Sequence, residues 1–76
     1  MNKDRRKELS KIVDELENLR DKIEELREEE QECYDNLPEG LQQAERGDQM
    51  LTAIDALDNA VCSVEDAINS IEEASE

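Results

Sequence analysis

The sequence predicts an all-α fold, an antiparallel helical hairpin with coiled-coil-like packing that dimerises into a four-helix bundle. Two observations support this prediction. Aliphatic residues recur at alternating steps of three and four along two stretches of about thirty residues, and a segment with proline and glycine separates the stretches. Seven residues make about two helical turns, so this spacing aligns the aliphatic side chains on one side of each helix. We therefore expect one domain over residues 1–76, with helices at about 3–35 and 45–74 and a turn at 36–44.

The first helix is predicted from an aliphatic row that begins at Leu9. With Leu9 at heptad position a, every a and d position through Leu26 is leucine or isoleucine. We expect this a/d row to face the second helix. Cys33 occupies the d position that follows Leu26 and has a smaller side chain, so we expect it to be a small core residue. Tyr34, the only aromatic residue, lies at position e. It either flanks the core or forms an exposed anchor for a partner.

The segment from Asn36 to Gly40 predicts the reversal of the chain. Pro38 disfavours helical geometry in Leu37 and has no backbone N–H, while Gly40 permits a turn. Proline suits the first position of a helix, so residues 38–43 are expected to form a short helical turn. The second long helix then begins near Glu45 without a strong cap.

Three heptads define the second helix: T-A-I-D-A-L-D, N-A-V-C-S-V-E and D-A-I-N-S-I-E. Each has alanine second, an aliphatic β-branched residue third and an aliphatic residue sixth, which gives an apolar seam with alanines along its flank. This face is wide enough for two neighbouring helices, so we expect the second helix to lie centrally in a dimer with the first helix outside. The residues predicted for the core and dimer seam are Ala53, Ile54, Leu57, Ala60, Val61, Val64, Ala67, Ile68 and Ile71.

The chain carries 23 acids, nine bases and no histidine, for a net charge of −14. This charge argues against direct binding to nucleic acid and favours solubility or a basic partner. The charge is unevenly distributed. Residues 1–11 carry a net positive charge, and residues 48–76 contain acidic residues but no basic ones. In a hairpin, Glu72, Glu73 and Glu76 would therefore lie beside the N-terminal bases. The two cysteines form no metal or redox motif, no apolar run is long enough for a membrane span, and we expect a cytoplasmic location.

The densest acidic segment is a candidate binding surface and not a catalytic site. Without histidine, and with little glycine or aromatic surface, the chain lacks the residues for an enclosed site, and the acids do not have EF-hand spacing. We therefore expect no enzyme activity, no cofactor and no metal. The exposed carboxylates either serve solubility or imitate nucleic-acid phosphates for a basic partner. The candidate acidic face consists of Glu24, Glu25, Glu28, Glu29 and Glu32.

The turn and second helix resemble a known group of proteins. The run N-L-P-E-G-L-Q-Q-A-E-R-G-D, followed by A-I-D-A-L-D-N-A-V and S-V-E-D-A-I-N-S-I-E-E-A, is similar to small acidic helical-hairpin proteins of phages, prophages and Gram-positive bacteria. The resemblance covers about residues 30–76. It implies a viral or mobile-element origin and supplies no catalytic residues. A serine is expected before Glu45, whereas this chain has Ala44.

Two functions are consistent with these features. The first is a non-enzymatic interaction protein of phage or prophage type that binds and inhibits a host protein with a basic surface in the host cytoplasm. A defence factor is one candidate target, and nucleic-acid mimicry is one candidate mode of binding. The alternative is a structural oligomerisation or assembly module. The charge and the resemblance favour the first, and the regular heptads favour the second.

Overall fold

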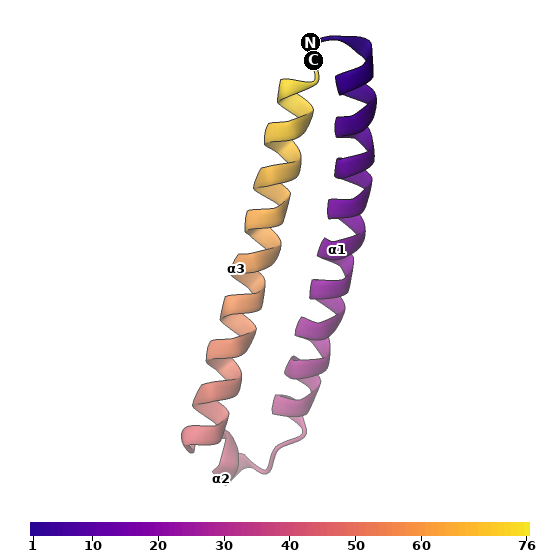
Figure 1. Cartoon of the computed structure of the whole chain (residues 1–76). Coiled ribbons are helices and arrows are strands. Elements are labelled where there is room, and N and C mark those ends of the chain that lie inside the picture. Colours follow the sequence, from indigo (N-terminus) through magenta and orange to yellow (C-terminus); the bar gives the residue numbers. More distant parts are fainter.

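Two long antiparallel helices make up almost the whole chain. The computed structural model describes all 76 residues and contains α1 (Lys3–Asp35), α2 (Glu39–Gln42) and α3 (Glu45–Ala74), with no strand. The helices pack side by side as a hairpin with both chain ends at the same end of a rod that measures 58 × 15 × 11 Å (Figure 1). The long helices coincide with the ranges expected from the heptads.

Short polar contacts define where each long helix begins and ends. At the start of α1, Asn2 adopts an extended conformation and its Oδ1 accepts a hydrogen bond of 2.8 Å from the backbone N–H of Arg5. At the end of α3, the Ser75 hydroxyl donates to the Ile71 carbonyl at 2.9 Å. Ala44 has the same extended conformation before α3 but offers no side-chain cap. The start of α3 is therefore the one long-helix N-terminus without a capping side chain.

The connection between the long helices is a compact turn built around α2. The Pro38 carbonyl accepts hydrogen bonds from the backbone N–H groups of Leu41 and Gln42, which confirms the short helical turn predicted after Pro38. The Gln42 side chain then donates to the Tyr34 carbonyl at 3.0 Å and ties the turn back to α1. Gly47 is buried where α3 crosses closest to the backbone of Gln42.

The core is a single seam between α1 and α3. Ile54 and Ile68 are the only buried large residues, 3% and 5% exposed. With Ile54 at heptad position a, the a and d residues of α3 are buried or half-buried, as the sequence predicted: Met50, Ile54, Leu57, Val61, Val64, Ile68 and Ile71. Of the flanking alanines, Ala60 is half-buried while Ala53 and Ala67 are exposed.

The face that α1 turns toward α3 differs from the predicted a/d row. Most half-buried residues of α1 are at positions a and e, with Val13, Arg20, Arg27 and Tyr34 at e. Glu17 and Gln31, at the adjacent position b, are half-buried as well. The d positions face outward instead, so Ile12, Leu19 and Leu26 are 42%, 51% and 57% exposed. Cys33, predicted as a small core residue, is exposed for the same reason. One neighbouring helix covers only part of the apolar side of α1, and here it covers the a/e part.

One interhelical ion pair shows which residues of the two long helices lie level. Arg27 Nε lies 2.8 Å from Asp58 Oδ1, and both residues are at heptad position e. The second ion pair, Arg20 with Asp21 at 3.3 Å, is local to α1. The basic start of α1 lies beside the acidic end of α3, as expected, and Arg6 borders the same groove as Glu72 and Glu76. No ion pair joins the N-terminal bases to Glu72, Glu73 or Glu76. Neither long helix contains a segment apolar enough to cross a membrane.

Candidate acidic interaction surface

The acidic patch, defined as Glu24, Glu25, Glu28, Glu29 and Glu32, occupies the outer side of the second half of α1. All five side chains are exposed. Glu30, the remaining glutamate in this run, is half-buried at position a and is not part of the patch. Successive residues of a helix are about 100° apart, so the five carboxylates spread over the side of α1 that does not contact α3.

Residues from α3 extend the patch at one edge of the hairpin. Glu24 and Glu28 border an open groove together with Asp58 and Glu65 of α3, and Arg27 lies between them. The guanidinium of Arg27 is bound to Asp58, so it offsets one carboxylate of this group and holds the two helices in register. The groove is shallow, so its carboxylates remain in contact with solvent and with any partner.

A second shallow groove lies toward the turn. Its lining consists of α1 side chains only, including Arg27, Glu28, Glu32 and Asp35. Gln31 closes the group by donating a hydrogen bond of 3.0 Å to Asp35. The acidic patch is thus a continuous solvent-facing surface about the C-terminal half of α1.

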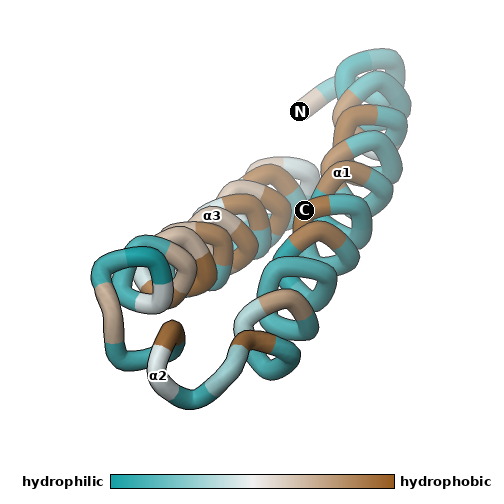
Figure 2. The backbone as a smooth tube through the Cα atoms, turned by 90° about the horizontal axis from the view of Figure 1, so that it is seen from below, coloured by the Kyte–Doolittle hydropathy of each residue, from teal (hydrophilic) through white to brown (hydrophobic).

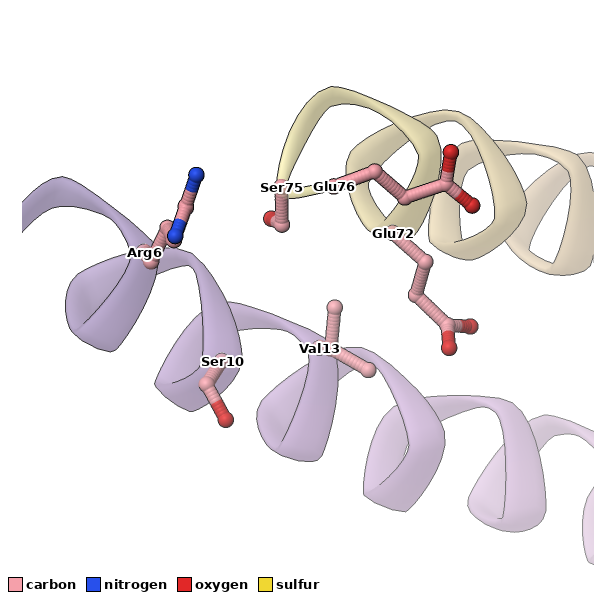
Figure 3. Close-up of a pocket in the computed structure, with 6 residues that line it drawn as sticks. All are labelled: Arg6, Ser10, Val13, Glu72, Ser75 and Glu76. Atoms are coloured by element: carbon pink, nitrogen blue, oxygen red, sulfur yellow. The ribbon is translucent and has the colours of Figure 1, made fainter. Parts of the chain in front are cut away.

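The open end of the rod carries a third groove of different composition. It is bordered by Arg6, Ser10 and Val13 from α1 and by residues near the end of α3 (Figure 3). The carboxylates of Glu72 and Glu76 extend away from Arg6 in this view, in agreement with the absence of an ion pair between them. The groove mixes both charge signs and lacks an enclosed apolar wall, so it does not select a ligand of one charge.

Charged side chains are the main feature of these surfaces. No group of three or more histidine, cysteine, aspartate or glutamate side chains is arranged to hold a metal ion. No buried side-chain nitrogen or oxygen is left without a hydrogen-bond partner, and both cysteines are free and exposed. Charged side chains on a convex rod attract a partner of opposite charge, and this attraction weakens with ionic strength.

Sequence reasoning identified the five glutamates of the patch but missed Arg27, Asp58 and Glu65. These residues join the patch only through the alignment of the two helices. The available signal was the e–e pairing of antiparallel helices, which places Arg27 beside Asp58 once the hairpin register is known. Comparison of the chain with known protein families, curated proteins and solved structures gives no match.

Proposed function

We propose that this chain is a non-enzymatic acidic interaction protein whose partner presents a basic surface. The observation that carries the proposal is the unpaired state of its acids. Of 23 acidic residues, only Asp21 and Asp58 form ion pairs, and the five glutamates of the acidic patch are exposed together on one element. Unpaired carboxylates at this density attract a complementary basic surface over roughly 10 Å at 0.1 M salt.

The resemblance to phage and prophage hairpin proteins supports a more specific form of this proposal. In that form the partner is a host protein, and binding inhibits it by occupying a cleft that normally receives nucleic acid. The fourteen net negative charges over the 58 Å rod average one per ~4 Å, compared with one per ~1.7 Å along a DNA duplex. Mimicry therefore depends on the denser local segment, where residues 24–35 contain seven acids and one base.

The experiment is a pull-down from bacterial lysate with the full chain as bait at about 50 and 200 mM salt. Neutralising the acidic patch by Glu→Gln at all five positions is expected to reduce the amount of basic protein retained by roughly tenfold. The wild-type chain is expected to release these proteins at the higher salt concentration. The control neutralises four exposed acids of α3 and the one that follows the helix, by Asp→Asn or Glu→Gln: Asp55, Asp66, Glu72, Glu73 and Glu76. The proposal would be overturned if the two neutralised variants retained equal amounts of basic protein, or if the amount retained by the wild type did not change with salt concentration.

A specific observation supports self-association as a second function. The hairpin buries only two large apolar residues and leaves leucine and isoleucine side chains of α1 in water. Domains of this size gain stability by oligomerising when their own core is small. We propose that two hairpins associate into a four-helix bundle, which the mass of the protein in solution tests directly: a monomeric mass at micromolar concentration excludes this function.

A further inference from the structure

The exposed d residues of α1 and the alanines of α3 lie along the same edge of the hairpin. Arg27 and Asp58 pair across the opposite edge, where both are at position e. In a heptad, position d lies on the other side of position a from e, and position g lies beyond d. The residues at d of α1 and at g of α3 therefore share the edge that the ion pair does not occupy. We call these residues the apolar edge: Ile12, Leu19 and Leu26 of α1 with Ala53, Ala60, Ala67 and Ala74 of α3.

The register places large and small residues of this edge side by side. Arg27 and Asp58 lie at the same level along the rod. Because the helices are antiparallel, a residue seven positions before Arg27 in α1 lies level with the residue seven positions after Asp58 in α3. Leu26 thus lies level with Ala60, and Leu19 lies level with Ala67. Figure 2 shows hydrophobic segments recurring along both helices, with α1 otherwise hydrophilic.

The side of α3 beside this edge carries no charge after the first turn of the helix. From Gln49 onward its c and g positions are all uncharged: Gln49, Ala53, Ala56, Ala60, Ser63, Ala67, Ser70 and Ala74. Arg46, at position g in the first turn, is the one charged residue on this side. The acids of α3 occupy the other exposed positions. A second strongly acidic molecule meets the least repulsion along this uncharged strip, because exposed charges repel over a Debye length of about 10 Å.

The hairpin exposes more surface than a compact monomer of its mass. The chain exposes 5751 Å², compared with about 4,700 Å² for a compact monomer, because it is a rod of 58 × 15 × 11 Å. An interface of standard size buries ~800 Å² of each partner, and a rod of this length has an edge long enough to supply it. The radius of gyration of 17.3 Å likewise exceeds the ~11 Å of a compact domain of this length.

We propose that the apolar edge is the docking surface for a second copy of this chain, with the two hairpins antiparallel so that their turns lie at opposite ends. This inference rests on the self-association proposed above and adds its surface and its orientation. Residues 1–11 have five bases and two acids, for a charge of +3, and residues 24–35 have a charge of −6. The antiparallel arrangement places each basic segment beside the partner's acidic segment. In the parallel arrangement the two-fold axis runs along the rod, so each acidic segment lies beside the α3 helix of the other copy, which has Asp55 and Asp58 and no base at that level.

In this arrangement a two-fold axis brings equivalent elements together. The Leu19 side chains meet near the axis, Ile12 lies toward Leu26 of the other copy, and the alanines of the two α3 helices face each other. Small side chains permit the shorter interaxial distances of the usual 8–10 Å range, so the two α3 helices lie closer to each other across the interface than the two α1 helices do.

The docking surface is tested by the mass of Leu19→Asp in solution. Leu19 is half exposed in the hairpin, so the aspartate leaves the helix and the α1–α3 seam intact. We expect a dimeric wild type and a dissociation constant raised at least ~100-fold in the variant, because the interface would bury an unpaired charge. Asn18→Asp, at the neighbouring exposed position, is the matched control and stays dimeric. A Leu19→Asp dimer as tight as the control would overturn the surface assignment.

The orientation is tested by the distance between labels on the two turns. Gly40→Cys, in a background with both native cysteines replaced by serine, places the label where a side chain meets no atom within 4 Å. In antiparallel hairpins the two labels are separated by most of the 58 Å rod, about 50 Å, compared with about 20 Å in parallel hairpins. The short distance would overturn the antiparallel arrangement. A monomeric wild type would overturn self-association itself, and neither result bears on the acidic patch.

Discussion

Gly47, in the first turn of α3, lets the chain reverse direction tightly because it lies against the backbone of Gln42. A Cβ atom on Gly47 would overlap the carbonyl oxygen of Gln42 and lie 2.6 Å from its carbonyl carbon. Neither glycine has a positive φ, so the requirement at this position is for space and not for an unusual backbone conformation. The sequence indicated only that Gly47 is tolerated near a helix start, since a close approach between backbones leaves no mark in the heptad pattern.

Gly47→Ala is therefore expected to destabilise the hairpin. The obstruction is backbone, which cannot rotate away as a flexible side chain can, so the cost is about 1–3 kcal/mol of the free energy of unfolding. Gly40→Ala is the matched control, because it meets open space within α2 and gains up to ~1 kcal/mol from helix propensity. Urea unfolding at one protein concentration measures both, and equal stabilities of the two variants would contradict the close approach.

Ala44→Ser is expected to stabilise the protein. Ala44 already has the extended conformation of a capping residue, with φ −90° and ψ 175°, but its methyl group cannot accept a hydrogen bond from the first turn of α3. A serine hydroxyl supplies that acceptor and adds ~1 kcal/mol. Ala56→Ser, at an exposed position inside the helix, should instead lower stability slightly. Thermal unfolding followed by circular dichroism distinguishes them, and a melting temperature of Ala44→Ser no higher than wild type would contradict the cap.

At the scale of elements, the heptads predict the helices, their antiparallel packing and the seam of α3, but not the rotation of α1 about its own axis. The apolar residues of α1 occupy positions a and d, with Val13 and Tyr34 added at e, where the remaining residues are arginines. The helix α3 covers the a/e part of this side. The observed a/e contact differs from the predicted a/d contact by a rotation of about 50°. Periodicity defines which side of a helix is apolar, whereas the partner decides which part of that side is covered. The acidic patch was predictable in the same sense, since its glutamates belong to one helix, while Asp58 and Glu65 required the register.

Ile68→Ala tests the seam that both elements share. Ile68 is 5% exposed, so removing its side chain leaves a cavity that α1 and α3 can fill only by shifting. The expected loss is about 2–5 kcal/mol in the free energy of unfolding, measured by urea titration. Asn69→Ala, at the adjacent exposed position, should change stability by less than ~0.5 kcal/mol. Similar losses in the two variants would show that α3 does not turn this side toward α1.

In the whole molecule, the apolar edge and the groove that contains Glu24 and Glu28 lie on opposite edges of one rod. Arg27 pairs with Asp58 at the edge with the groove. Association through the apolar edge therefore leaves that groove open in both copies. A dimer would present two such grooves, and a partner with two basic surfaces would gain affinity by engaging both.

The same charge distribution makes the stability of the rod depend on salt. A net charge of −14 is confined to a body only 15 × 11 Å in cross-section, and just two ion pairs oppose the repulsion. Raising sodium chloride from about 0.01 to 0.15 M shortens the Debye length from ~30 to ~8 Å, which weakens repulsion between distant carboxylates more than attraction within close pairs. We expect the melting temperature to rise by about 5 °C, equivalent to roughly 1 kcal/mol for a domain of this size.

Neutralising the five glutamates of the acidic patch should reduce this salt dependence, because it removes charge from the densest segment. The α3 variant with five neutralised acids removes the same number of charges from a more dilute region, so its salt dependence should lie between that of the patch variant and that of the wild type. Chloride is used because sulfate would strengthen apolar burial by itself. A wild-type melting temperature that falls with sodium chloride would mean that attraction between the basic start of α1 and the surrounding acids outweighs the repulsion, and that the charge of the rod stabilises its fold.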